Sequence, residues 1–208
     1  MAKKLKAKIQ TDFDASYNVA PSTVNPAVRL RPDSRERAMD GLKWGLIPSW
    51  AKDSKFAPAN ARADTVAEKP FFRGALKKKR CLVPMDGFYE WDSKTKPKQP
   101  YYFYMKSGEP FVVAGLWETW TPPGKKEPLE TYTLITTEAN PLMAKVHDRM
   151  PVILEEADYE AWLDPETPVE QLLKLLKPYP AEKMACHAVS LEVNKPATNK
   201  PECIAEKP

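Results

Sequence analysis

The sequence is poor in cysteine, with only Cys81, Cys186 and Cys203 among its 208 residues. Their number is odd and no two have metal-ligand spacing, so we expect neither a disulfide framework nor a zinc site. Cys81 and Cys186 lie in the apolar stretches CLVPM and CHAV, which are typical of buried small hydrophobic residues. A cysteine hydrolase is one alternative, but a thiolate is disfavoured in such surroundings. We expect no metal and no cofactor.

Long apolar runs are also absent, and none approaches the roughly 20 residues that a membrane helix needs. The basic start MAKKLKAKIQ has no apolar segment of the kind found in secretory signals. Apolar residues still make up 42% of the chain, enough for a sizeable core. We therefore expect a soluble cytoplasmic monomer with no membrane partner, folded as one domain over residues 1–208.

Neither sign of charge dominates, because 32 basic residues face 28 acidic ones and the net charge is only +4. This balance neither indicates nor excludes a nucleic-acid partner. The densest basic run is Lys77-Lys78-Lys79-Arg80, just before an apolar segment. It predicts either a local DNA-binding face or the solvated end of a helix.

Glycine is scarce, with seven residues, whereas 22 prolines are spread along the chain and indicate short elements joined by rigid turns. Spacings of the capping-box type at Thr65 and Thr167 predict helix starts, and a further helix is expected over Glu155–Leu163. In Tyr101–Tyr104 nearly every position is aromatic, which suggests a strand covered on both faces. The pattern predicts an α+β domain with a curved mixed β-sheet or partial barrel flanked by short helices. Short β-branched or aromatic segments predict strands at 42–47, 81–85, 88–91, 101–105, 111–117, 132–136, 152–154 and 188–191.

Only two histidines are present, and His147 lies in the sequence Val-His-Asp-Arg-Met-Pro between an expected helix and an expected strand. Such a residue is suited to general acid or base work near neutral pH, although a structural role is the alternative. Glu90 is a carboxylate inside the aromatic segment Gly-Phe-Tyr-Glu-Trp. If Phe88 shares its face, desolvation would raise the pKa of Glu90; otherwise Glu90 points outward into solvent.

Two further segments contain residues suited to nucleic acids. Asn60-Ala61-Arg62 combines an amide with a guanidinium, the usual clamp for phosphate. In Trp44-Gly-Leu-Ile-Pro-Ser-Trp50, the second tryptophan is a candidate stacking platform for an unpaired base. The alternative is a core anchor, which is the expected role of Trp44.

Taken together, these segments occur in the order and spacing of the SOS-response-associated peptidase family. Tyr-Asn-Val-Ala-Pro at 17–21, the Trp44–Trp50 segment, Asn-Ala-Arg, Gly-Phe-Tyr-Glu-Trp and His-Asp-Arg-Met-Pro stand in register. Ala-Val-Ser at 188–190, followed by Asn194, resembles the family's C-terminal segment. The resemblance covers roughly residues 16 to 204.

The resemblance implies a protein that binds abasic sites in single-stranded or junction DNA and becomes nucleoid-associated when bound. In the family an N-terminal cysteine forms a thiazolidine with the ring-opened aldehyde, and members are described as autoproteolytic peptidases with lyase-like chemistry. The implied catalytic residues are Asn60, Glu90 and His147. The implied DNA-binding residues are Asn18, Trp50, Arg62, Thr136 and Arg149.

The start of the chain differs from the family pattern, which is Met-Cys-Gly-Arg. Here the sequence begins Met1-Ala2-Lys3-Lys4 and has no cysteine before Cys81. We expect the catalytic N-terminal strand to be missing or divergent. Two hypotheses stay open: a repair protein that cross-links to abasic DNA, and a single-stranded DNA-binding module without covalent chemistry. In both, Asn60, Glu90 and His147 are expected to meet in one cleft.

Overall fold

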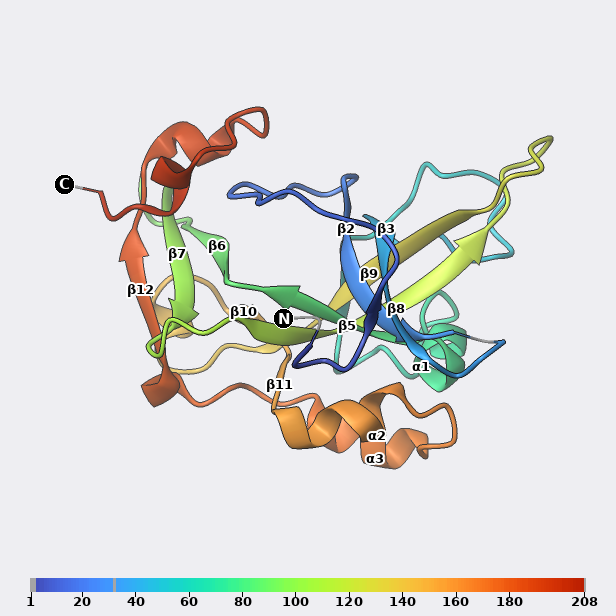
Figure 1. The fold of residues 1–208 in the computed structure, drawn as a ribbon. Coiled ribbons are helices and arrows are strands. Elements are labelled where there is room, and N and C mark those ends of the chain that lie inside the picture. The colour runs from blue at the N-terminus through green and yellow to red at the C-terminus, as the bar shows by residue number, and fades with distance from the viewer. Residues whose placement is uncertain (1–2, 32, 208) are drawn as a thin grey trace.

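Two β-sheets and several short helices make up the fold, which we describe from a computed structural model (Figure 1). The structure describes residues 3–31 and 33–207. Over these residues the larger sheet has nine strands and the smaller sheet has three. The predicted α+β class is confirmed, with a mixed, curved sheet and only short helices.

The larger sheet closes on itself. Its order is β1-β3-β2-β5-β8-β9-β10, with β4 beside β9 and β11 beside β8. A parallel pairing of Trp44 on β3 with Tyr132 on β9 joins the ends of the path β3-β2-β5-β8-β9 into a barrel, as the sequence predicted. The strands are β1 (Lys8–Ile9), β2 (Val24–Leu30), β3 (Arg37–Trp44), β4 (Asn60–Arg62), β5 (Arg80–Met85), β8 (Phe111–Trp120), β9 (Leu129–Glu138), β10 (Arg149–Pro151) and β11 (Ile153–Leu154).

The smaller sheet is antiparallel, with β7 (Gln99–Met105) between β6 (Gly87–Asp92) and β12 (Met184–Ala188). Successive side chains of a strand point to opposite faces. Phe103 accordingly packs into the core shared with the barrel, while Tyr102 packs against Val189 and Cys203 of the C-terminal segment. Both faces of β7 are therefore covered, which confirms the expectation from its aromatic run.

The helices α1 (Arg73–Lys78), α2 (Tyr159–Leu163) and α3 (Val169–Leu175) lie along one side of the barrel in Figure 1. Each contributes to one buried cluster, through Leu76, Trp162 and Leu172, and Leu116 of β8 belongs to it too. Short 3-10 turns stand at Met143–Lys145, Glu156–Asp158, Ala181–Lys183, Leu191–Asn194 and Pro201–Ile204. No helix in the described part of the chain is long and apolar enough to cross a membrane.

Three expected boundaries are wrong. The predicted strand at 42–47 ends at Trp44, because Gly45 has a φ of +126°, which breaks the extended backbone. The predicted strand at 188–191 is replaced by β12, which ends at Ala188. Thr65 starts no helix: residues 63–68 form turns, and α1 begins eight residues later at Arg73.

The basic run at 77–80 does not form a uniform charged face. Arg80 is 2% exposed and its guanidinium donates to the backbone carbonyls of Leu76, Lys77, Trp162 and Asp164. Burial lowers the pKa of Arg80 to about 10. Its role is to satisfy carbonyls at the ends of α1 and α2, so it cannot contact a phosphate.

Candidate active site

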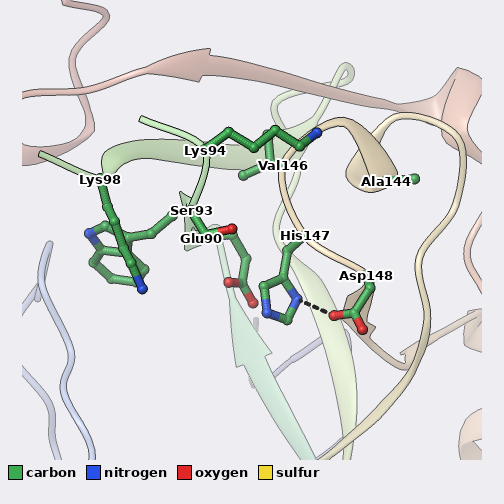
Figure 2. Close-up of a pocket in the computed structure, with 9 residues that line it drawn as sticks. Glu90, Ser93, Lys94, Lys98, Ala144, Val146, His147 and Asp148 are labelled. Atoms are coloured by element: carbon green, nitrogen blue, oxygen red, sulfur yellow. Dashed lines mark ion pairs between the residues drawn. The ribbon is translucent and has the colours of Figure 1, made fainter. Parts of the chain in front are cut away.

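A cavity of about 660 Å³ lies between the end of β6 with its following loop and the segment that leads into β10 (Figure 2). Glu90 and His147, two of the predicted catalytic residues, both line it. Glu90 lies on β6 of the smaller sheet and His147 in the segment just before β10 of the larger sheet, so they are brought together by the packing of the small sheet against the barrel. The full lining consists of Glu90, Trp91, Ser93, Lys94, Lys98, Ala144, Val146, His147 and Asp148.

Strand β6 places Glu90 at this cavity. The strand begins at Gly87, where a Cβ atom would lie 2.3 Å from the ring of Tyr102, so only glycine permits the approach of β6 to β7. Phe88 and Glu90 share one side of the strand, and Phe88 stacks on Phe103 with ring centroids 5.4 Å apart. This anchors the strand and leaves Glu90 beside an apolar cluster, as the sequence pattern suggested.

The turn before His147 is held by Asn140, and the Asn-Pro pair at 140–141 predicts a short helical turn that leads to His147, which is found at Met143–Lys145. Its side-chain oxygen accepts from the backbone N–H of Met143 at 2.9 Å, and its amide donates to the carbonyl of Tyr179 at 2.8 Å. Asn140 is only 4% exposed, so its polar atoms are bonded within the protein.

His147 stands between two carboxylates (Figure 2). Its Nδ1 lies 3.3 Å from Oδ1 of Asp148, and Glu90 is on the other side of the ring. Nδ1 also lies 3.1 Å from the backbone nitrogen and 3.4 Å from the backbone carbonyl oxygen of Arg149, so it has a hydrogen-bond partner in either tautomer of the neutral imidazole. The imidazole is exposed at the cavity wall, within reach of a bound molecule.

The environment of Glu90 shifts its acidity. Burial raises the pKa of Glu90, a protonated His147 acts in the opposite direction, and the net pKa stays above its ordinary value. The carboxyl group therefore keeps its proton to higher pH than an exposed glutamate does. A carboxylic acid of raised pKa can donate a proton while an imidazole beside it accepts another. The two groups together therefore meet the requirement for general acid–base chemistry.

The predicted DNA-binding residues Arg62, Thr136 and Arg149 meet on three neighbouring strands. Arg62 of β4 pairs in register with Thr136 of β9, whose other neighbour is Pro151 of β10. Arg149 donates to the carbonyl of Thr136 at 2.6 Å. Hydrogen bonding to Asp64 raises the pKa of Arg62, and a smaller effect in the same direction comes from Asp148.

The remaining predicted residues lie in different places. Asn60 is exposed on β4, on the same side as Arg62, but does not line the cavity. Asn18 donates to the carbonyls of Val193, Lys195 and Thr198, and so ties the N-terminal segment to the C-terminal one. Trp50 is 64% exposed, with its ring at an edge to that of Phe71 and centroids 5.9 Å apart.

Asp64, a residue that the sequence did not single out, pairs with both arginines. It accepts from Arg62 Nη2 at 2.6 Å and lies 3.8 Å from Arg149 Nη1. Hydrogen bonding from Arg62 lowers the pKa of Asp64, so the carboxylate stays ionised at neutral pH. An acidic residue two positions after the Asn-Ala-Arg segment was the signal that could have identified it.

We expect Asp64→Asn to bind single-stranded DNA about threefold to tenfold more tightly at low salt, because it removes a negative charge that competes with phosphate for Arg62 and Arg149. Fluorescence anisotropy at two salt concentrations measures the change. Asp53→Asn is the matched control, since Asp53 faces Lys55 in an exposed loop at 3.8 Å. An affinity gain no larger than that of the control would show that the arginines contact no phosphate.

Comparison with known proteins places this arrangement in a family. The sequence profile of the SOS response associated peptidase (SRAP) family matches residues 1–196. The chain is 46% identical over 199 residues to "Abasic site processing protein YoqW" of Bacillus subtilis, covering 93% of this chain and 87% of that protein. It is 37% identical over 224 residues to "Abasic site processing protein HMCES" of Gallus gallus, covering 92% of this chain and 66% of that protein.

Solved structures agree with the sequence comparison. A crystal structure of a protein from Bacteroides thetaiotaomicron is 34% identical with a TM-score of 0.80, over 89% of this chain and 82% of that one. A second, from Bordetella bronchiseptica, is 31% identical with a TM-score of 0.80, over 92% and 94% of the two chains. The profile match covers most of the sequence and the fold is shared throughout. This chain therefore belongs to the SOS response associated peptidase family.

Proposed function

We propose that this chain processes abasic sites in DNA, and that the cavity between Glu90 and His147 receives the abasic sugar. The single observation that carries the proposal is the pairing of a half-buried acid of raised pKa with an exposed imidazole at one cavity wall. Relatives whose names describe abasic site processing, at 46% and 37% identity, support the substrate class.

The proposed chemistry opens the sugar ring. An abasic deoxyribose is mostly a closed hemiacetal, which hides its aldehyde. Protonated Glu90 donates a proton to the ring oxygen as the bond between C1′ and that oxygen breaks. Neutral His147 accepts the proton of the C1′ hydroxyl, so that an aldehyde and a free hydroxyl are left. The charge that His147 gains is then balanced by Glu90 and Asp148 on either side.

The surroundings of the cavity support single-stranded DNA as the partner. Arg62 and Arg149 are placed to contact flanking phosphates, and Asn60 and Thr136, on the neighbouring strands β4 and β9, would contact the DNA. Exposed Trp50 can stack on an unpaired base, an interaction worth roughly 1–3 kcal/mol per base that a duplex denies it. Affinity should fall as salt rises, because each neutralised phosphate releases counterions. We propose that a monomer suffices, since all these residues belong to one chain.

None of the cysteines in the described part of the chain lines the cavity. Burial raises the pKa of Cys81 to about 12 and also raises that of Cys186, while Cys203 is 1% exposed. Thiolates at Cys81 and Cys186 are therefore disfavoured, and Cys203 is buried away from the cavity. We infer that a covalent thiazolidine in this family fold requires an N-terminal cysteine, and that Cys81, Cys186 and Cys203 do not substitute for it.

Borohydride trapping on single-stranded DNA with one abasic site tests the proposal, and an unreactive tetrahydrofuran analogue measures binding alone. We expect the 208-residue chain to bind both DNAs in a salt-dependent manner, with weak, borohydride-dependent trapping of the first. Binding without any trapping would favour the alternative, a non-covalent single-stranded DNA-binding module. Equal affinity for single-stranded and duplex DNA, unchanged in Trp50→Ala, would contradict the proposed DNA form and the role of Trp50.

A further inference from the structure

We propose that Lys94 and Lys98, on the loop between β6 and β7, form a phosphate-binding rim of the cavity and hold a backbone phosphate next to the abasic sugar. This inference rests on the proposed function and adds a second phosphate contact on the side of the cavity that is formed by this loop. Neither lysine belongs to the predicted DNA-binding set.

The two lysines line the same cavity as Glu90 and His147. Figure 2 shows Lys94 extending along the upper rim toward Val146, and Lys98 on the opposite side of Ser93. The ammonium of Lys94 reaches across the cavity mouth and lies 3.5 Å from the carbonyl of Lys145. Both side chains therefore line the cavity that holds the acid and the imidazole, one on either side of Ser93 (Figure 2).

Both charges are available to a ligand. Arg62, an exposed cation near the site, is paired with Asp64 at 2.6 Å. By contrast, Lys94 and Lys98 form no ion pair with any described residue, and the hydrogen bond of Lys94 is to a neutral carbonyl. The loop itself is fixed: Asp92 accepts from the backbone N–H of Lys94 at 2.9 Å, and Thr95 accepts from that of Gln99 at 2.7 Å.

The acidic residues of the same cavity explain why a phosphate ligand would need these two lysines. Asp148 is acidic and would repel a phosphate that flanks a sugar placed in the cavity, and Glu90 would do the same once it has given up its proton. Two ammonium groups at the rim offset this repulsion, while the uncharged sugar lies against the acid and the imidazole. The cavity is thus divided into an acidic floor that suits a neutral sugar and a basic rim that suits a phosphodiester.

The test uses single-stranded DNA with a tetrahydrofuran abasic analogue, so that binding is measured without reaction. We expect Lys94→Gln/Lys98→Gln to bind this DNA about tenfold more weakly at low salt. The slope of log affinity against log salt should fall by about 0.7 for each phosphate that the variant no longer neutralises. Lys125→Gln/Lys126→Gln is the control, because it makes the same charge change in the exposed loop between β8 and β9.

A second arm locates the phosphate. Replacing single linkages near the analogue by uncharged methylphosphonates should weaken binding of the parent chain at one or two positions and leave the lysine double variant unaffected there. Equal decreases in affinity for the lysine double variant and the control would contradict the proposed phosphate-binding rim. If the parent chain still binds the DNA in that case, the proposed function is unaffected. A parent chain that binds no DNA would overturn both.

Discussion

A chain given a Met-Cys-Gly-Arg start and a short strand-forming segment before Lys3 should form a cross-link to abasic single-stranded DNA that survives denaturing electrophoresis without reductant. The unmodified 208-residue chain should form none. A thiazolidine requires an amine and a thiol on adjacent carbons, which among the standard residues only an N-terminal cysteine provides. Ala2, which lies outside the described residues, offers at most an amine and hence a hydrolysable imine.

The matched control carries Met-Ser-Gly-Arg in place of Met-Cys-Gly-Arg, so that the amine is kept and only the thiol is removed. It should be trapped by borohydride and released without it. Lys3 and Lys4 carry further amines near the start of the chain, but neither has a thiol on an adjacent carbon, so neither can close a thiazolidine. A reductant-free cross-link formed by the unmodified chain would mean that one of the internal cysteines is the nucleophile.

The second large effect concerns stability. Arg29→Ala should lower the free energy of unfolding by about 3–5 kcal/mol, because it leaves a buried carboxylate without its partner. Arg29 is 3% exposed; its Nε lies 2.8 Å from Asp40, its Nη2 bonds Glu130, and its guanidinium carbon is 4.2 Å from the Trp117 ring centre. Asp40 would retain only Arg31, at 2.8 Å.

Urea unfolding measures this change, and thermal unfolding should show a fall in Tm of roughly 6–20 °C for a chain of this length. Arg35→Ala is the control, since Arg35 is exposed and lies 3.5 Å from an exposed Asp164; its destabilisation should stay below about 1 kcal/mol. The double variant Arg29→Met/Asp40→Leu, which replaces both partners, should lower the free energy of unfolding by less than Arg29→Ala does. A destabilisation by Arg29→Ala that matches the control would contradict the structural role of this network.

The ion-pair network of Arg29, Asp40 and Glu130 also shows why some strands were predicted from the sequence and β2 was not. Residues 111–117 of β8 are apolar or aromatic and were predicted as a strand from local pattern alone, although the strand continues to Trp120. Strand β2 was missed because Pro26 and Arg29 interrupt its pattern. Arg29 is tolerated inside the barrel only through Asp40 on β3 and Glu130 on β9, and such distant partners leave no trace in the local sequence of the strand.

The candidate site was also only partly predictable, because the local sequence shows which residues are unusual but not which distant residues they contact. Glu90 stood out as a carboxylate in an aromatic strand, and His147 as a histidine beside charged residues and a proline. That both line one cavity depends on how the small sheet packs against the barrel, and only the spacing of the family motifs indicated it. Asp64 was missed because it acts through Arg62 and Arg149, not through the substrate.

The rate of cross-linking in the cysteine-bearing chain tests the role of the Glu90–His147 cavity most directly. We expect Glu90→Gln and His147→Ala each to slow the reaction by about 10²-fold or more, whereas Glu109→Gln, outside this cavity, leaves it unchanged. Because the raised pKa of Glu90 keeps it protonated to higher pH, the rate of the parent should fall as pH rises through that pKa, and this limb should vanish in Glu90→Gln. Rates in both variants equal to that of the Glu109→Gln control would contradict the assignment of Glu90 and His147 as the acid and base that open the abasic sugar.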